Sequence, residues 1–240
     1  MRLIFTIIFA AMFAAIAVLG IMLDPARSAP LLSAASANGK PDSQSLEQSL
    51  YDGWRASQLL GGSVFSLKGE YLGETRNVVL DDSGQIRFVV VEGAGTRANP
   101  EFMFRIPWAR IMRPLHARAL IADFSDFQSR QYGLFFDPDH QEPGPTDFPI
   151  SKVIGDYARL QAGQGFGYVS DLVFNQNGRL LAILVLRDSS AGGGTYAFPY
   201  PGKTGKWSPN VSYYGLPYVT EEQATQAAVR VDLNRFDRQS

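Results

Sequence analysis

Residues 57–92, SQLLGGSVFSLKGEYLGETRNVVLDDSGQIRFVVVE, recur as residues 151–186, SKVIGDYARLQAGQGFGYVSDLVFNQNGRLLAILVL, at a constant offset of 94 residues without a gap. Seven positions are identical, and four of these are glycines. Glycine recurs where a backbone needs positive φ or passes close to another strand, so a backbone path is duplicated. The sequence therefore predicts two copies of one small β module, with the glycines as structural residues. The glycine pairs are Gly61 and Gly155, Gly69 and Gly163, Gly73 and Gly167, and Gly84 and Gly178.

Each copy contains short apolar segments separated by turn residues. Asp82-Ser83-Gly84 in the first copy and Asn177-Gly178 in the second are typical of hairpin turns. Short strands at regular spacing with glycine turns are typical of small barrels. We therefore expect an all-β protein made of two tandem small β-barrels. The segments predicted as strands are residues 63–67, 73–80, 86–91 and 102–106 in the first copy and 157–161, 167–174, 180–186 and 196–198 in the second.

The first copy resembles a known domain family. The residues that carry the resemblance are RASQLLG at 55–61, KGEYLGE at 68–74, DDSG at 81–84 with the Val-rich segment after it, and IPW at 106–108. They are similar to the PRC-barrel domain over about residues 54–112, and the second copy is a looser match over about residues 149–202. The resemblance implies a PRC-like six-stranded barrel that serves as a docking or assembly module and brings no catalytic residues.

The N-terminus carries a run of 21 uncharged residues, Leu3 to Leu23, between Arg2 and Asp24. In a helix this run rises about 31 Å, enough to span the core of a bilayer. The length favours a retained N-terminal hydrophobic helix that acts as a signal anchor. The small residues of Ala35-Ser36-Ala37 also suit a signal peptidase, so a cleaved signal peptide stays open. Either alternative predicts an exported protein, periplasmic or anchored in the inner membrane with its globular part outside the cytoplasm.

The composition divides the chain into six expected parts. The C-terminal part is expected to contain a short helix over residues 220–231, with Thr220 as N-cap and Gln223 completing a capping box. The parts are residues 1–30 as signal peptide or signal anchor, 31–50 as flexible tether, 51–115 as first barrel, 116–148 as aromatic inter-barrel segment, 149–202 as second barrel and 203–240 as C-terminal extension.

Charge and cysteine content exclude several classes of function. Lys plus Arg number 22 against 23 for Asp plus Glu, and the charges are interspersed, so a nucleic-acid partner is not expected. The chain has no cysteine. It therefore has no disulfide, no thiolate nucleophile, no Cys-ligated zinc and no acylated cysteine of the kind that anchors bacterial lipoproteins.

One motif resembles a catalytic loop. Asp81-Asp82-Ser83-Gly84 is similar to the Asp-Ser/Thr-Gly loop of aspartic proteases, which need two such loops so that paired carboxylates share a proton. The second copy has Asn175-Gln176-Asn177-Gly178 at this place, without a carboxylate. A hairpin turn is therefore the favoured interpretation. His116 and His140 have no Ser or Cys arrangement typical of a triad and are interpreted as surface residues.

An acidic loop offers weak candidate metal ligands. Asp137, Asp139 and Glu142 could present carboxylate oxygens to Ca²⁺. The spacing does not match an EF-hand, because Pro138 interrupts it and a glycine comes only at Gly144. A solvated loop is the alternative interpretation.

Aromatic and large apolar residues are enriched between the predicted barrels and after the second one. They either cover the barrel ends and join the barrels, or form an exposed binding patch. We expect the inter-barrel group to be buried, so that the barrels form one rigid body. The residues are Phe124, Phe127, Leu134, Phe135 and Phe136 in the first group and Trp207, Tyr213, Tyr214 and Tyr218 in the second.

These observations lead to one function hypothesis and one alternative. The expected function is that of a non-enzymatic, exported protein-interaction or scaffold module of the cell envelope. It is expected to have a protein partner, no cofactor, and contact with the membrane through an uncleaved N-terminal helix. The alternative is a small-ligand or metal-ion binding protein that uses the cleft between the barrels. An enzyme of unknown type is the third possibility.

Overall fold

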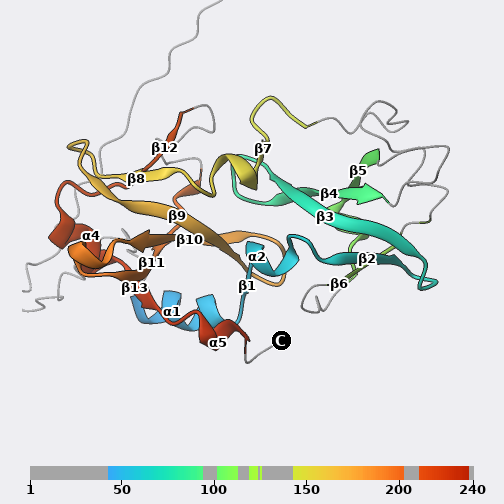
Figure 1. Ribbon diagram of the computed structural model, residues 1–240, viewed down its shortest axis with the longest axis horizontal. Helices are drawn as coiled ribbons and strands as arrows, with labels where there is room; N and C mark the ends of the chain where they lie inside the picture. The colour runs from blue at the N-terminus through green and yellow to red at the C-terminus, as the bar shows by residue number, and fades with distance from the viewer. Residues whose placement is uncertain are drawn as a thin grey trace, which may run out of the picture. The chain divides into compact units, whose positions relative to one another are not determined.

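Two β-sheets form the framework of the described structure (Figure 1). The computed structural model describes residues 43–93, 102–112, 119–123, 125, 143–202 and 211–237, all of which lie in one compact unit, Lys40–Ser240. The mostly-β fold class is therefore confirmed. Among these residues no helix combines the length and the apolar character needed to cross a bilayer, and the apolar run at residues 3–23 lies outside them.

The first sheet forms from the first copy of the repeat. Its strand order is β5-β4-β3-β2-β6; β2 and β6 run parallel and the other neighbours run antiparallel. All four strands predicted in this copy are present. β6 comes from the segment expected to lie between the modules, so that segment contributes to the sheet. The bounds are β2 Ser63–Ser66, β3 Tyr71–Leu80, β4 Ile86–Gly93, β5 Phe102–Pro107 and β6 Ala119–Ala122.

The second sheet repeats this arrangement. Its strand order is β12-β8-β9-β10-β11-β13, and β12 lies parallel to β8 as β6 lies parallel to β2. The four strands predicted in the second copy are also present, and β12 and β13 come from the predicted C-terminal extension. The bounds are β8 Tyr157–Arg159, β9 Gly165–Phe174, β10 Leu180–Arg187, β11 Gly194–Pro199, β12 Tyr213–Gly215 and β13 Val229–Val231.

The repeat extends to the backbone hydrogen bonds around the glycine turns. The amide of Gly61 donates to the carbonyl oxygen of Thr75, and the amide of Gly155 donates to that of Val169, each over 2.8 Å. These donors and these acceptors are related by the same offset of 94 residues. The two copies therefore follow one backbone path, as the glycine spacing predicts.

The expected closure of each sheet into a barrel is not found among the described residues. In the first sheet, β5 ends at Pro107 and the short helix η1, Trp108–Arg110, redirects the chain. Directly after η1, the amide of Met112 donates to the carbonyl oxygen of Ile121 in β6 over 2.8 Å. Because this contact involves only the few residues after η1, the ladders form an open sheet rather than a ring.

The helices are short. α4, Glu221–Ala227, begins as predicted, because the Thr220 side chain accepts from the amide of Gln223 in a complete capping box. It ends earlier than expected, since the β-branched residues that follow form β13 against β11. The remaining bounds are α1 Ser43–Tyr51, α2 Ala56–Leu59, η2 Ile150–Lys152, η3 Ser189–Ala191 and α5 Asn234–Asp237.

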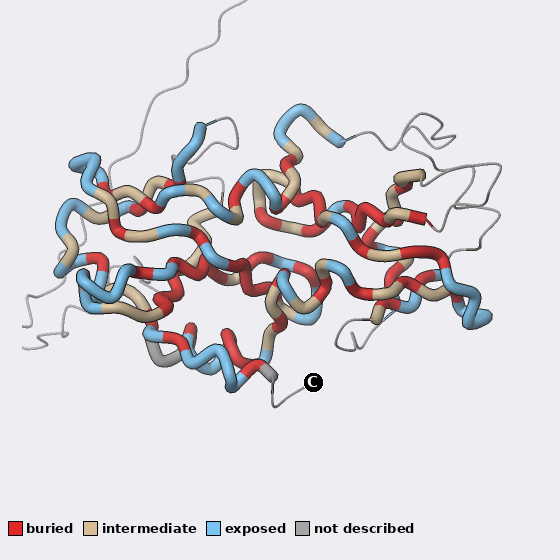
Figure 2. The backbone as a smooth tube through the Cα atoms, in the orientation of Figure 1, coloured by how far each residue is buried: buried red, intermediate tan, exposed pale blue. Residues whose placement is uncertain are grey.

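Buried residues occur along the strands of both sheets (Figure 2), and they form a core that is continuous from one sheet to the other. One core cluster contains residues of both sheets, and a second cluster lies between the second sheet and the helices α1 and α5. In that second cluster the rings of Tyr51 and Phe236 lie 5.1 Å apart. α1 starts inside the part expected to be a tether, because Leu46 and Leu50 are buried in this cluster. The continuous core makes the two sheets one packed body.

Candidate functional site: the junction of the sheets and two exposed faces

The two sheets exchange strands at their junction. β1, Trp54–Arg55, precedes the first sheet but pairs with β9 of the second, and β7, Phe148–Pro149, precedes the second sheet but pairs with β3 of the first. The two pairings are equivalent under the offset of 94 residues. The modules are therefore not independent tandem units, because each sheet contains a strand that comes directly before the other sheet in the sequence. The paired residues are Trp54 with Phe174, Arg55 with Val173, Phe148 with Leu80, and Pro149 with Val79.

The hairpin turns of the two copies meet at the same junction. Gln85 and Arg179 form an antiparallel bridge. On either side of it, the amide of Ile86 donates to the carbonyl oxygen of Gly178 over 2.9 Å, and the amide of Leu180 donates to that of Gly84 over 2.8 Å. Each contact maps onto the other under the repeat, so the junction has the reciprocity of a two-fold interface.

Aromatic side chains at the ends of β5 and β11 cross the junction. The indole Nε1 of Trp108 donates to the carbonyl oxygen of Asn177 over 3.0 Å, and the hydroxyl of Tyr200 donates to that of Asp82 over 3.2 Å. Burial, with the nearby carboxylates of Asp82 and Asp81, raises the pKa of Tyr200 to about 12. The Ile-Pro-Trp and Phe-Pro-Tyr endings therefore bind each sheet to the turn of the other.

A buried polar contact also crosses the junction. The carboxylate of Asp171 accepts from the amide of Ser57 over 3.1 Å and from its hydroxyl over 2.5 Å. A guanidinium nitrogen of Arg55 lies 3.5 Å from the same carboxylate. Burial raises the pKa of Asp171, and the hydrogen bonds from Ser57 and the charge of Arg55 oppose that rise. At the equivalent place, the Nδ2 of Asn77 donates to the hydroxyl of Ser151 over 2.8 Å.

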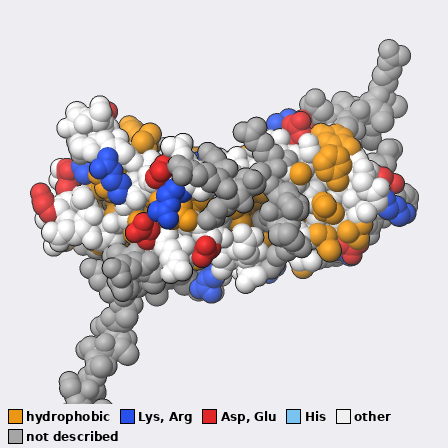
Figure 3. Space-filling view, turned by 90° about the horizontal axis from the view of Figure 1, so that it is seen from below, with side chains coloured by type: hydrophobic (Ala, Val, Ile, Leu, Met, Phe, Trp, Pro, Cys, Tyr) orange, Lys and Arg blue, Asp and Glu red, His pale blue; other side chains and the backbone are white. Residues whose placement is uncertain are grey.

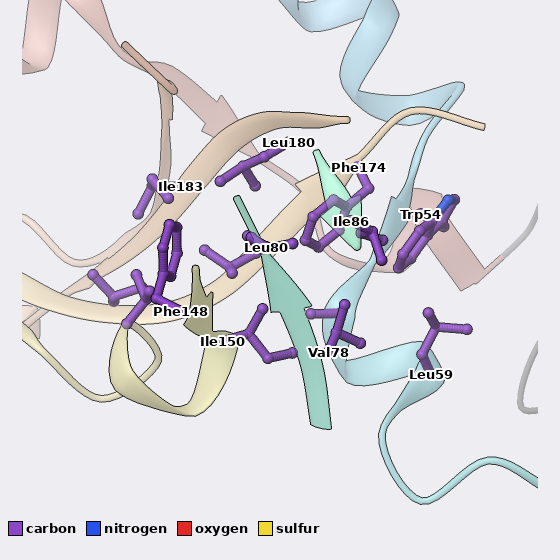
Figure 4. Close-up of a cluster of buried hydrophobic side chains, with 14 of the residues drawn as sticks. Trp54, Leu59, Val78, Leu80, Ile86, Phe148, Ile150, Phe174, Leu180 and Ile183 are labelled. Carbon is purple, nitrogen blue, oxygen red and sulfur yellow. The ribbon is translucent and has the colours of Figure 1, made fainter. Parts of the chain in front are cut away.

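Apolar side chains from both copies fill the space between the sheets (Figure 4). Trp54 stacks on Phe174 with their ring centroids 4.7 Å apart. The region expected to hold a ligand cleft is thus occupied by core packing in the described residues. The labelled side chains of this cluster are Trp54, Leu59, Val78, Leu80, Ile86, Phe148, Ile150, Phe174, Leu180 and Ile183.

The eight glycines singled out by the repeat, Gly61, Gly69, Gly73, Gly84, Gly155, Gly163, Gly167 and Gly178, all have positive φ. The crowding predicted at Gly73 and Gly167 is present. A Cβ on Gly73 would lie 2.1 Å from the carbonyl oxygen of Glu92, and one on Gly167 would lie 2.3 Å from that of Leu186. These positions exclude larger residues because another strand passes against the backbone.

The catalytic-looking motif is a turn. The Oδ1 of Asp81 accepts from the amides of Ser83 and Gln85, over 2.9 and 3.0 Å. In the second copy, the Oδ1 of Asn175 accepts from the equivalent amides of Asn177 and Arg179, over 2.9 and 3.0 Å. The same local geometry forms with or without a carboxylate, so the side chain of Asp81 stabilises the turn as a hydrogen-bond acceptor.

The weak metal candidates Asp137, Asp139 and Glu142 lie outside the described residues, as do His116 and His140. Within the described part of the chain, no group of three or more His, Cys, Asp or Glu side chains could hold a metal ion. The inter-barrel aromatic group at residues 124–136 and Trp207 also lie outside it. Of the C-terminal group, Tyr214 is buried and Tyr218 packs on the core, whereas Tyr213 is exposed.

Four exposed side chains form a line across the second sheet. Tyr213 of β12 pairs with Tyr157 of β8, which pairs with Tyr168 of β9, which pairs with Leu186 of β10. Their exposed fractions are 39%, 39%, 58% and 50%. The rings of Tyr157 and Tyr168 lie 5.0 Å apart, and the guanidinium of Arg159 lies 4.9 Å from the Tyr213 ring. We call Tyr213, Tyr157, Tyr168 and Leu186 the tyrosine row.

The equivalent line of the first sheet contains no large apolar side chain. It consists of Ala119, Ser63, Glu74 and Glu92, joined by the same strand pairings. Arg76 forms ion pairs with both glutamates. The sequence interpretation missed the row, although aligning the two copies and looking for polar residues replaced by apolar ones would have found three of its members.

A second exposed apolar group lies on the first sheet. Phe65 of β2 pairs with Tyr71 of β3 on one side and with Ile121 of β6 on the other. Leu67 follows β2, and Met112 is hydrogen-bonded to Ile121 through the backbone. We call Phe65, Leu67, Tyr71, Met112 and Ile121 the apolar patch. Figure 3 shows hydrophobic side chains gathered over the first sheet, at the right of the view.

Comparison with known proteins places the first sheet in a family. A model described as the PRC-barrel domain matches residues 52–126, a range that includes β1 and all strands from β2 to β6. A search of curated proteins finds no match to the chain. The match agrees with the resemblance carried by the Gly-rich turns and by the Ile-Pro-Trp ending. The chain therefore contains a PRC-barrel domain over residues 52–126.

Proposed function

We propose that this chain is a non-enzymatic, exported protein of the cell envelope that binds a protein partner through the tyrosine row. The observation that carries the proposal is the row itself, in which four large side chains stand exposed on consecutive strands of one sheet. The row is not required by the fold, since the first sheet forms the same ladders with Ala119, Ser63 and two glutamates in its place.

The chemistry of the row suits a protein partner. Tyrosine combines a large apolar ring with a hydroxyl that can donate or accept, and it is enriched at the centres of protein interfaces. Rings on adjacent strands form a continuous surface because strands are spaced about 4.8 Å apart. Such a surface buries apolar area upon binding and still satisfies polar groups of the partner.

The strand exchange supports the role of a scaffold. β1 and β7 join the two sheets through backbone ladders, and the core is continuous across them. A rigid support lowers the entropy lost when a surface binds its partner. The row is thus held in one arrangement before binding.

Export and membrane attachment are the remaining parts of the proposal. They are supported by the run of 21 uncharged residues at positions 3–23, which has the length of a membrane-spanning helix. In this arrangement the folded unit faces the periplasm, and the N-terminal helix holds it at the inner membrane.

The test is crosslinking and affinity capture from membranes, with the full chain as bait. The Tyr168→Ser variant should lose the specifically crosslinked partner, because Tyr168 lies in the middle of the row and is its most exposed member. Val219→Ser is the control, since it removes an apolar side chain that is 51% exposed and lies outside both the tyrosine row and the apolar patch. Both variants should unfold at the wild-type temperature. Equal capture by Tyr168→Ser and wild type would show that the row is not the binding surface.

A further inference from the structure

The apolar patch is a group of neighbouring side chains that the fold leaves exposed. Leu67, Tyr71, Met112 and Ile121 are 56%, 45%, 45% and 43% exposed, and they adjoin one another across β3, β2 and β6. Contiguous exposed apolar groups mark contact with a protein or a membrane. In the second sheet, Arg159 and Gly165 stand where the first has Phe65 and Tyr71, so the patch is specific to the PRC-barrel domain.

The residues around the patch suit the boundary between lipid and water. Lys68, at the tip of the β2–β3 turn, is exposed and can extend its ammonium group to the headgroup level while its stem lies along apolar surface. Tyr71 has the amphipathic ring that is enriched at membrane interfaces. The side chain of Glu70 lies against the turn, and its carboxylate accepts from the hydroxyl of Ser66 over 3.3 Å. Charges of both signs are present, so apolar burial is the main source of affinity.

The chain enters the folded unit on the side that carries the patch. α1, the first described element, and β6 both lie on the lower side of Figure 1, and Figure 3 looks at that side. Between the apolar run that ends at Leu23 and the start of α1 at Ser43 there are 19 residues, 24–42. Even a fully extended chain of this length spans at most about 65 Å, so the unit stays beside any membrane that holds the run.

We propose that the apolar patch docks the PRC-barrel domain onto the lipid surface of the membrane that holds the N-terminal run. This docking rests on the anchoring part of the proposed function. The tether supplies a high effective concentration of lipid, so a weak contact through a few side chains suffices. A lipid surface is preferred to a second copy of the chain, because Lys68 and Tyr71 supply at the patch the side chains that suit the boundary between lipid and water.

Two strands of the tyrosine row lie away from the strands of the apolar patch. Figure 1 shows β8 and β12 on the upper side of the view, opposite β2 and β6. In the docked arrangement β2 and β6 lie next to the lipid, whereas β8 and β12, which carry Tyr157 and Tyr213 of the row, lie farther from it.

The absence of cysteine allows a direct test on the full chain. A single cysteine is introduced as Leu67→Cys or, in the matched control, as Leu186→Cys, and is labelled with an environment-sensitive fluorophore. Both positions are about half exposed, at 56% and 50%, so neither change disturbs the core. Each protein is reconstituted into phosphatidylcholine vesicles that carry nitroxide groups on their acyl chains.

Nitroxide quenching is expected at position 67 and not at position 186. It should persist at raised salt, because the contact is apolar. Equal quenching at both positions, or none at position 67 in a chain that floats with the vesicles, would overturn the docking alone. A chain that does not float refutes the membrane anchor and the docking with it. A spectral shift at position 67 that grows with protein concentration, without quenching, would assign the patch to self-association and also overturn the docking.

Discussion

The indole ring of Trp108 covers the Cα of Gly178, on the hairpin turn of the other sheet. A Cβ at Gly178 would lie 2.4 Å from the indole Nε1, and the backbone there has a φ of +76°. The relation is reciprocal, since a Cβ at Gly84 would lie 2.7 Å from the ring of Tyr200. Two separate constraints therefore favour glycine at both positions. The turn needs a positive φ, and an aromatic ring from the opposite sheet leaves no room for a Cβ.

Replacing Gly178 by alanine should cost more than replacing a glycine with the same conformation in open space. Gly61 is the matched control, because its φ is +74° and a Cβ added there would meet nothing within 4 Å. Gly61→Ala should cost about 1–2 kcal/mol through its left-handed conformation. Gly178→Ala should cost a further 1–3 kcal/mol or so, since the ring of Trp108 must move. Urea unfolding measures both, and equal costs would show that the indole contact is dispensable.

Valine at Gly73 or Gly167 should destabilise the protein in the same way at both positions. In each case the new Cβ meets the carbonyl oxygen of a neighbouring strand, which cannot rotate away. The expected loss is on the order of 1–3 kcal/mol or more for each variant, from strain and overpacking together. Thermal unfolding is the measurement. Variants that melt at the wild-type temperature would show that the sheets tolerate a side chain here.

The two sheets should unfold in a single cooperative transition. The ladders that β1 and β7 form with the opposite sheets, and the continuous core, couple the stability of one sheet to that of the other. Calorimetry on the full chain should give one peak whose calorimetric and van't Hoff enthalpies agree. Two separate peaks would contradict this coupling. So would a fragment of residues 50–112 that folds as stably as those residues do in the full chain, because it lacks β6 and β7.

Asp171→Asn should reduce the dependence of stability on pH. A carboxyl whose folded pKa is raised by burial binds its proton more tightly in the folded state, so its contribution to stability falls as pH rises through that pKa. The asparagine does not titrate, and Asn77 shows that an amide makes the equivalent contact with Ser151. As pH rises above the ordinary carboxyl range, the unfolding free energy of the variant should increase relative to that of the wild type. A difference that stays constant, or that moves toward the wild type, would contradict the assignment.

Local features of this protein could be read from its sequence because their causes are local. Gly73 and Gly167 have positive φ because a strand passes against them, and the repeat marks both positions. The capping box of Thr220 and Gln223 starts α4 where the spacing predicts it. The tyrosine row was missed because its members lie on four strands. Only the strand register brings Tyr213 beside Tyr157 and Tyr168 beside Leu186.

The sequence by itself determined two copies of one β module, their turns and their strands, since backbone conformation and alternating burial depend on neighbouring residues. Only the tertiary structure decided which sheet is joined by β1 and by β7, the strands that precede the first and the second copy. Because the repeat gives the two sheets equivalent long strands, β3 and β9, β7 could pair with β9 of its own copy or with β3 of the other without any change in local pattern. Side-chain packing at the junction, with Phe148 against Leu80 and Trp54 against Phe174, selects the exchanged arrangement. Packing of this kind depends on shape across the whole core, which no local segment of the chain specifies.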